Sequence, residues 1–239
     1  MLELKDVVFT VDTEFGKRNV IDGVSLSVDE RFVAITGPNG SGKSTLAKLI
    51  MGIEKPTSGK IFFNGQDVTE LSISDRAKIG IGYAFQQPVR FKGITVRDLI
   101  NAASGKILTV SDACSYLSEV GLCARDYVDR ECNASLSGGE LKRIEIAIAL
   151  ARGAKLTVFD EPEAGIDLWS FNSLIKVFEK MYEKTSGSIL IISHQERILN
   201  IADRVILIEN GKIKKDGTKQ EVLPDILTPS VCPVVKKDC

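Results

Sequence analysis

Runs of apolar residues predict a series of β-strands along the first third of the chain. Residues 2–10 are rich in β-branched and apolar side chains, residues 24–28 alternate apolar and polar positions, and residues 32–36 are apolar almost throughout. Alternation is typical of a strand with one buried face, whereas a continuous short run is typical of a strand buried on both faces. Asn64 and Gly65, between two β-rich segments, predict a hairpin turn.

The last third of the chain alternates between buried-strand patterns and segments long enough for helices. Apolar runs at residues 156–159, 189–193 and 205–208 predict strands. Before them, residues 144–151 carry apolar side chains at helical spacing, which indicates a helix with one buried face. Such alternation predicts a mainly parallel sheet with helices on both of its faces.

The middle of the chain has a different, helical character. Residues 95–104 and 111–122 are predicted helices, and Ser111 is the predicted N-cap of the second. We interpret residues 87–138, approximately, as a helical subdomain inserted into the α/β domain.

One domain is predicted to span residues 1–222, followed by a tail at residues 223–239. The tail has three prolines within ten residues and no hydrophobic period, so from Pro224 onward we expect it to be extended or mobile. It also holds Cys232 and Cys239, whose spacing matches no standard zinc or iron–sulfur pattern. We interpret these cysteines as reduced thiols, with a tail metal site as the alternative.

Charge and composition exclude several classes of function. The chain of 239 residues is 44% hydrophobic, which is enough for a sizeable core. Its 31 basic and 32 acidic residues give a net charge of −1, so no general attraction to nucleic acid or anionic membranes is expected. The first residues do not resemble a signal peptide, and the apolar runs are too short for a bilayer. We therefore expect a cytoplasmic protein without a transmembrane segment of its own, whose membrane role, if any, requires a partner.

Residues 37–45 read Gly-Pro-Asn-Gly-Ser-Gly-Lys-Ser-Thr and carry a specific phosphate-binding motif. The pattern G-x-x-x-x-G-K-[ST] stands directly after one predicted strand and before a predicted helix at residues 44–51. In such a loop the backbone N–H groups surround the phosphates, the lysine reaches the β- and γ-phosphates, and the serine offers its hydroxyl to Mg²⁺. The predicted nucleotide-binding residues are Gly37, Pro38, Asn39, Gly40, Ser41, Gly42, Lys43, Ser44 and Thr45.

Four further polar residues complete a candidate hydrolytic site. Asp160, Glu161 and His194 follow predicted strands, and Gln86 follows a short apolar stretch. Asp160 is predicted to hold Mg²⁺, directly or through water, and Glu161 to polarise the attacking water. His194, the only histidine, ends another strand, and ligands bind at the carboxyl ends of such strands. We predict that it contacts the γ-phosphate and the water, which makes Lys43, Glu161 and His194 the catalytic set. Gln86 is predicted to bind Mg²⁺ or water through its amide oxygen.

The order of these motifs, with "LSGGE" at residues 136–140 and "GID" at residues 165–167, resembles the ATP-binding cassette (ABC) ATPase domain over residues 2–222. "LSGGE", some twenty residues before "FDE", is the most specific element because other P-loop classes lack it. The resemblance implies an α/β P-loop NTPase fold with a parallel-sheet core, an N-terminal antiparallel β subdomain and a helical insertion. It also implies ATP and Mg²⁺ as cofactors and hydrolysis of ATP to ADP and phosphate.

The resemblance further implies a head-to-tail homodimer that closes on two ATP–Mg²⁺ and opens after hydrolysis. The signature motif of the family contacts the γ-phosphate of ATP held by the opposite protomer, and a second loop, the D-loop, crosses the dimer interface. Gln86 matches the loop that links the nucleotide to the helical subdomain and its partner, and His194 matches the switch histidine. The implied interface residues are Ser137, Gly138, Gly139 and Glu140 in the signature and Gly165 and Asp167 in the D-loop.

The residue that stacks on adenine stays open at this point. Members of the family often use an aromatic residue in the first strands, and Val11 stands near that place. Phe15 in the following loop is the alternative.

Local details are similar to SufC-like ATPases of iron–sulfur cluster assembly. These details are the segment "AFQQPVRFKGITV", the segment "SHQERIL", and Glu140 where transporters usually have glutamine. The Glu161-Pro162 pair and the short helical insertion favour a transporter instead. We interpret the protein as a SufC-like ATPase that drives a SufB/SufD-type scaffold, with no nucleic-acid partner. The alternative is the nucleotide-binding subunit of an ABC transporter, partnered by a membrane permease; a non-catalytic clamp is disfavoured by Glu161 and His194.

Overall fold

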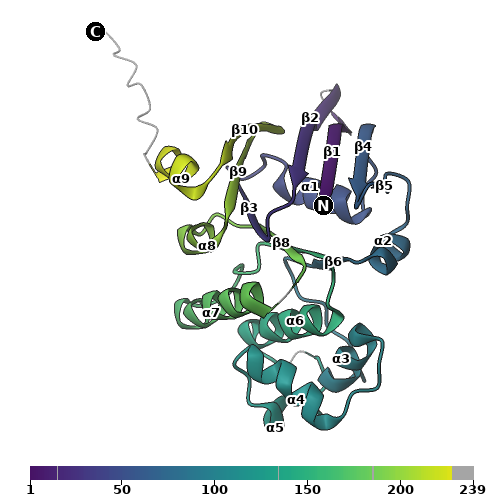
Figure 1. Cartoon of the computed structure of the whole chain (residues 1–239), viewed down its shortest axis with the longest axis vertical. Coiled ribbons are helices and arrows are strands. Elements are labelled where there is room, and N and C mark those ends of the chain that lie inside the picture. The colour runs from purple at the N-terminus through teal and green to yellow at the C-terminus, as the bar shows by residue number, and fades with distance from the viewer. Residues whose placement is uncertain (15, 134, 185, 228–239) are drawn as a thin grey trace.

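The computed structural model describes residues 1–227 except 15, 134 and 185, and within them two β-sheets and surrounding helices (Figure 1). The strands are β1 (Leu2–Thr13), β2 (Gly16–Val28), β3 (Phe32–Thr36), β4 (Ser58–Phe63), β5 (Gln66–Asp67), β6 (Ile81–Ala84), β7 (Leu156–Asp160), β8 (Ser188–Ile192), β9 (Arg204–Glu209) and β10 (Lys212–Gly217). The helices are α1 (Lys43–Met51), α2 (Ile73–Ile79), α3 (Val96–Ser104), α4 (Val110–Glu119), α5 (Ala124–Tyr127), α6 (Gly138–Arg152), α7 (Leu168–Lys184), α8 (Glu196–Ile201) and α9 (Lys219–Leu227).

The smaller sheet is the predicted antiparallel β subdomain, in the order β2-β1-β4-β5. β1 pairs antiparallel with both β2 and β4. Asn64 and Gly65 form the turn between β4 and β5 with φ of 51° and 80°. Positive φ at both central residues is what a two-residue type I′ hairpin requires, and Asn-Gly meets that requirement at low cost.

The larger sheet, in the order β10-β9-β3-β8-β7-β6, is parallel except for β10. Every residue of β3 is buried, because its side chains alternate between two cores. Phe32 and Ala34 pack with the residues of α6, α7 and α8, whereas Val33 and Ile35 pack with α1 and the smaller sheet. The predicted fold class is therefore confirmed, and helices cover the sheet as Figure 1 shows.

Strand register places the carboxyl ends of β3, β7 and β8 side by side. Ile192 of β8 is opposite Ile35 of β3 and opposite Asp160 of β7. The loops that leave these three strands, after Thr36, Asp160 and Ile192, therefore begin at one edge of the sheet. This edge brings together segments that lie more than a hundred residues apart in sequence.

Helices α3, α4 and α5 gather beside α6, away from the smaller sheet (Figure 1). The predicted N-cap at Ser111 is wrong, because α4 begins at Val110 with Thr109 as its N-cap. The Thr109 hydroxyl accepts a hydrogen bond from the Asp112 N–H at 3.1 Å, and the Asp112 carboxylate accepts one from the Thr109 N–H at 3.2 Å. A reciprocal capping box needs an acid three residues after the cap, and Ser111 has Cys114 there. The bounds of the inserted subdomain stay a prediction.

Helix α9 crosses the predicted start of the tail at residue 223. Residues 224–227 are helical rather than extended, although Pro224 lies inside the helix. Val222 and Leu223 are buried in the core that α7 and α8 also line, and this burial holds the segment in place. Cys232 and Cys239 lie outside the described residues, so the interpretation of their thiols stays a prediction.

Candidate active site

The phosphate-binding loop runs from β3 to α1 and is packed tightly against two other strands. Gly37, Gly40 and Gly42 have φ of 146°, 76° and 103°, a region that favours glycine. A Cβ atom on Gly37 would lie 2.0 Å from the carbonyl oxygen of Ile208, and one on Gly42 would lie 2.7 Å from that of Val20. Neighbouring backbone therefore leaves no room for a side chain at either position, and the path of the loop is fixed.

Lys43 holds a positive charge in the middle of this loop. Its side chain is buried, and its Nζ donates hydrogen bonds to the carbonyl oxygens of Gly37 at 2.8 Å and Pro38 at 2.9 Å. Burial lowers the pKa of Lys43, while the nearby carboxylates of Glu161 and Asp160 act in the opposite direction. The loop is thus built around a cation at the place where the motif requires one for phosphate oxygens.

Ser44 and Asp160 form the candidate magnesium site. The Ser44 hydroxyl donates to Asp160 Oδ1 at 3.0 Å, and the hydroxyl of Tyr83 donates to Asp160 Oδ2 at 2.9 Å. Burial and the Asp160 charge raise the pKa of Tyr83, so its phenol keeps the proton that it donates. A hydroxyl and a carboxylate side by side are the hard oxygen ligands that Mg²⁺ prefers, so the residues suit that ion. Tyr83 was not predicted from the sequence.

Glu161 and Gln86 meet directly across the same site. The amide nitrogen of Gln86 donates to Glu161 Oε2 at 2.8 Å. Glu161 has a φ of 44°, and its N–H donates to the carbonyl oxygen of Ile192 at 2.9 Å. A non-glycine residue with positive φ is uncommon and costs free energy, and such residues concentrate at functional sites. The backbone of Glu161 is thus held in a strained turn that directs its carboxylate towards Gln86.

A cleft of 360 Å³ joins the loop, Gln86 and Glu161. Val11 does not line the cleft and Phe15 lies outside the described residues, whereas Val20 of β2 does line it. The sequence does not predict that Val20 lines the cleft, because this depends on how β2 packs against the loop. The lining residues are Val20, Asn39, Gly40, Gly42, Lys43, Ser44, Thr45, Gln86 and Glu161.

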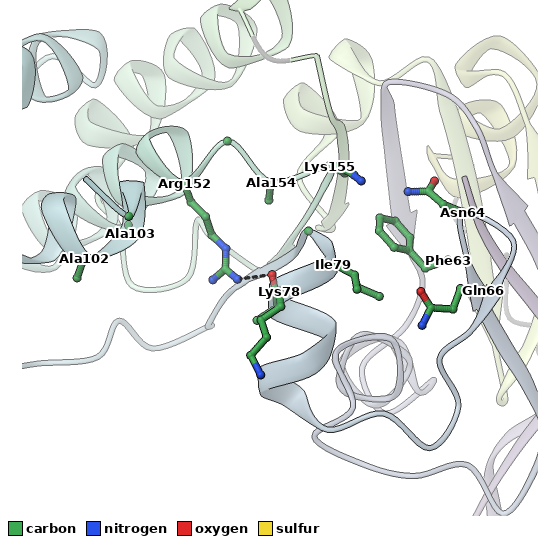
Figure 2. A pocket seen from close by; sticks show the side chains of 14 residues that line it. Phe63, Asn64, Gln66, Lys78, Ile79, Ala102, Ala103, Arg152, Ala154 and Lys155 are labelled. Atoms are coloured by element: carbon green, nitrogen blue, oxygen red, sulfur yellow. Dashed lines mark hydrogen bonds between the residues drawn. The ribbon is translucent and has the colours of Figure 1, made fainter. Parts of the chain in front are cut away.

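A larger cleft of 810 Å³ lies elsewhere and contains none of the predicted site residues (Figure 2). The C-termini of α2, α3 and α6 meet at it, and Arg152 there donates to the carbonyl oxygen of Ala77 at 2.9 Å. Helix C-termini present carbonyl oxygens and a partial negative charge. Lys78, Arg152 and Lys155 also line the larger cleft, but none of the predicted site residues does, so its size does not locate the chemistry.

His194 leaves the same sheet edge but does not line the 360 Å³ cleft. It follows β8, its side chain is 57% exposed, and its Nδ1 lies 4.0 Å from Oε1 of the buried Glu163. The predicted contact of His194 with a γ-phosphate stays a prediction. Glu163 was not singled out in the sequence, because its partners come from a segment thirty residues away.

The signature residues lie at the start of α6, outside the cleft of their own chain. Ser137 is the N-cap of α6, and its hydroxyl accepts from the Glu140 N–H at 3.3 Å. Glu140 Oε2 accepts from the Ser137 N–H at 2.7 Å, and the Tyr127 hydroxyl donates to Oε1. The bond from Tyr127 helps hold the pKa of Glu140 below its usual value. The first turn of α6 therefore carries a complete capping box, and the N–H groups that the box leaves unpaired suit an anion.

The D-loop lies against this helix start. Gly165 has a φ of 74°, and its carbonyl oxygen lies 3.6 Å from the position of a Cβ on Gly138. Asp167 Oδ1 accepts a hydrogen bond from the Ser170 N–H at 3.0 Å in the first turn of α7. A Cβ on Gly139 would lie 3.2 Å from the Ser170 hydroxyl. Signature and D-loop thus form one surface, separate from the nucleotide cleft of the same chain.

Comparison with known proteins gives a family match and close relatives. A protein-family model described as "ABC transporter" matches residues 21–164. An uncharacterized ABC transporter ATP-binding protein of Methanocaldococcus jannaschii is 41% identical over 216 residues, which cover 87% of this chain and 86% of that protein. The sulfate/thiosulfate import ATP-binding protein CysA of Mesorhizobium japonicum is 32% identical over 225 residues, and the match covers 90% of this chain but 64% of CysA.

A solved structure has the same fold. The ATP-binding cassette MJ0796, determined as a dimer in a post-hydrolysis state bound to ADP and phosphate, superposes with a TM-score of 0.80 at 25% identity. The match covers 92% of this chain and 99% of the other.

Proposed function

This chain belongs to the ABC transporter family, whose general activity is ATP hydrolysis, and we propose that it is the nucleotide-binding subunit of a transporter. The names of both relatives support a transport role, because one is an ABC transporter ATP-binding protein and the other serves sulfate or thiosulfate import. They do not support the prediction of a SufC-like ATPase with a SufB/SufD scaffold. The transporter alternative therefore becomes the main proposal.

Glu140, on which the SufC-like prediction partly rested, has a local structural role. Its carboxylate completes the capping box of α6 and accepts the Tyr127 hydroxyl, so it has a local structural use. Glutamate and glutamine both serve at this position of a capping box. The choice of Glu140 therefore says nothing about the partner of the protein.

Exposed apolar side chains surround Gln86 and suit a protein partner. Phe85, Val89 and Phe91 are large hydrophobic residues left exposed on the segment after β6. In the part of the chain that the structure describes, no helix could cross a membrane. We propose that the membrane-spanning partner is a separate chain that covers this apolar segment, because exposed groups of apolar residues mark interaction sites.

The proposed catalysis rests on positioning and electrostatics. Lys43 stabilises negative charge on the β- and γ-phosphates, and Ser44 with Asp160 would hold Mg²⁺, which supplies further positive charge there. Glu161 accepts a hydrogen bond from the attacking water and aligns it with the γ-phosphorus. Gln86 holds the Glu161 carboxylate at 2.8 Å, and the amide oxygen of Gln86 is left for the metal.

A second copy of the chain would complete the site. Gly138 of the signature lies beside Gly165, and neither residue lines the cleft of its own chain, so the predicted contact of the signature with ATP requires another protomer. MJ0796, which shares the fold, forms a dimer in its structure. We infer a two-fold arrangement in which the N-terminus of α6 from one copy faces the cleft of the other.

The observation that carries the ATPase assignment is that Ser44, Gln86 and Glu161 line one cleft and that Asp160 accepts a hydrogen bond from Ser44. The test is phosphate release from Mg-ATP by the purified protein and by Glu161→Gln. We expect the variant to bind ATP and to lose nearly all turnover, with the exposed Glu70→Gln as a control that stays active. Native turnover by Glu161→Gln would remove Glu161 from the mechanism.

Copurification tests the transporter assignment separately. Tagged protein should recover a polytopic membrane protein from detergent-solubilised membranes. Replacing Phe85 and Phe91 together by serine should abolish that recovery without unfolding the chain, since both side chains are exposed. Recovery of a partner without membrane spans, accompanied by iron and sulfide, would overturn the transporter proposal and restore the assembly interpretation.

A further inference from the structure

Glu163 is a buried acid that the mechanism above does not use. It lies three residues after Asp160, and its side chain is only 4% exposed. Burying a carboxylate costs free energy unless it is paired, and burial raises the pKa of Glu163. A carboxylate whose burial costs free energy beside a reaction site is expected to have a compensating interaction or a function.

One oxygen of Glu163 is anchored at the end of β8. The hydroxyl of the fully buried Ser193 donates to Glu163 Oε1. The same hydroxyl accepts a hydrogen bond from the Gln195 N–H at 3.0 Å. Ser193 thereby ties the carboxylate to the backbone on both sides of His194, and Glu163 Oε2 has no hydrogen-bond partner among the described residues.

Glu163 Oε1, the oxygen bonded by Ser193, also lies near the ring of His194. The distance from His194 Nδ1 to Glu163 Oε1 is 4.0 Å, so a movement of about 1 Å gives a hydrogen bond of ordinary length. The ring is 57% exposed, and its other nitrogen, Nε2, lies 3.4 Å from the side-chain amide nitrogen of Gln195. The titratable groups that act on Glu163 are His194 and Glu161, and of these only His194 can donate to it at neutral pH.

We propose that Glu163 is a positioning residue that accepts a hydrogen bond from His194 Nδ1–H and thereby directs Nε2 towards the γ-phosphate. A partner on one ring nitrogen decides which nitrogen carries the proton and how the ring is oriented. When the ring is protonated, both nitrogens carry a proton, so Nε2–H can donate to a phosphate oxygen while Nδ1–H stays hydrogen-bonded to Glu163. The catalytic part of this inference rests on the proposed ATPase function, but the contact between Glu163 and His194 does not.

The chain offers a direct spectroscopic test, because His194 is its only histidine. Two-bond ¹H–¹⁵N correlation spectra of untagged, ¹⁵N-labelled protein show which ring nitrogen carries the proton, at a pH where the ring is neutral. With a single histidine, the ring signals need no resonance assignment. We expect the Nδ1–H tautomer in the native protein, although Nε2–H predominates in free histidine. Glu163→Gln places an amide beside the ring and should shift the population towards Nε2–H, whereas the exposed Glu196→Gln, which removes the same charge nearby, should not.

Kinetics test the consequence for turnover. Glu163→Gln should lower kcat for ATP roughly tenfold to a hundredfold with little change in KM, by analogy with the loss of the outer carboxylate that orients a metal-bound histidine. In a His194→Ala background the same substitution should have no further effect, because it acts through the ring. An equal loss in both backgrounds would show a merely structural role and overturn the proposal.

The two proposals fail in different ways. A native protein that releases no phosphate would refute the ATPase assignment and leave the tautomer measurement valid. A native spectrum dominated by Nε2–H would refute the positioning role even if ATP is hydrolysed at a normal rate, and this result needs no variant to fold.

Discussion

The buried pair Lys142 and Glu145 on α6 gives the most stringent test of how this helix is joined to the cleft. Their side chains are 2% and 18% exposed. Lys142 Nζ donates to the carbonyl oxygen of Phe85 at 2.5 Å and to Glu145 Oε2 at 3.2 Å, while Glu145 Oε1 accepts from the Phe85 N–H at 2.9 Å. One turn of α6 therefore satisfies both backbone groups of the residue before Gln86.

Removing either partner leaves the other in apolar surroundings. Lys142→Met keeps the length of the side chain but leaves Glu145 charged, and burial already raises the pKa of that carboxyl. Breaking a buried pair on one side costs about 3–5 kcal/mol, and the partial exposure of Glu145 places the expected loss near the lower end. Glu145→Gln retains an acceptor for the Phe85 N–H, so we expect a smaller loss of about 2 kcal/mol.

The double variant Lys142→Met, Glu145→Gln leaves no buried charge. We expect it to lose about 3 kcal/mol, rather than the roughly 5 kcal/mol that independent effects would give, so the coupling is about 2 kcal/mol. Urea unfolding followed by circular dichroism, with equal m-values across the set, measures these differences. The control pair is Lys184 and Glu119, which is largely exposed and should couple by less than about 1 kcal/mol. If the two single variants lose amounts of stability that simply add up to the loss of the double variant, Lys142 and Glu145 do not stabilise each other as proposed.

The remaining predictions concern the loop, the dimer and acid stability. Lys43→Ala should lose ATP binding or turnover, measured by calorimetry and phosphate release. Gly37→Ala should also lose ATP binding, because its Cβ would lie 2.0 Å from a backbone oxygen. Ser137→Arg should bind ATP but not dimerise with it; an unchanged light-scattering dimer signal would contradict this. The folded state depresses the pKa of Glu140 from 4.5, so the stability that this carboxylate contributes is present above pH 4.5 and is lost as the pH falls through its depressed pKa in the folded protein. Tyr127→Phe should therefore reduce the difference in unfolding free energy between pH 7 and pH 3.5, measured by urea unfolding.

The parts of the fold that the sequence predicts are those in which burial dictates residue type. The predicted strand at residues 32–36 coincides with β3, because a strand buried on both faces is apolar at nearly every position. Asn64 and Gly65 were predictable for another local reason, since few residues accept the φ of their turn. The N-cap of α4 was missed because two hydroxyl residues compete two positions apart, and the acid at Asp112 decides between them.

The parts that the sequence does not predict depend on contacts between distant segments. Tyr83 reaches Asp160 across 77 positions, and Lys142 reaches Phe85 across 57. No period or motif records such a pair, because each residue taken alone fits an ordinary strand or helix. Glu163 illustrates the same limit, since its burial and its partner Ser193 emerge only when β7 and β8 lie side by side. The P-loop motif, by contrast, carries its backbone geometry within nine consecutive residues.

Helix α6 connects two places that a dimer would bring into use. Its N-terminus at Ser137 carries the capping box and does not line the cleft of its own chain, while Lys142 and Glu145, one to two turns further on, hold Phe85. At 1.5 Å per residue these points are about 10 Å apart on one rigid helix. A displacement of α6 that follows contact with the ATP of a second copy must therefore move the backbone beside Gln86, unless the buried pair breaks. Gln86 in turn holds Glu161, so the helix start that we propose to contact one nucleotide is mechanically linked to the carboxylate that we propose to act on the other.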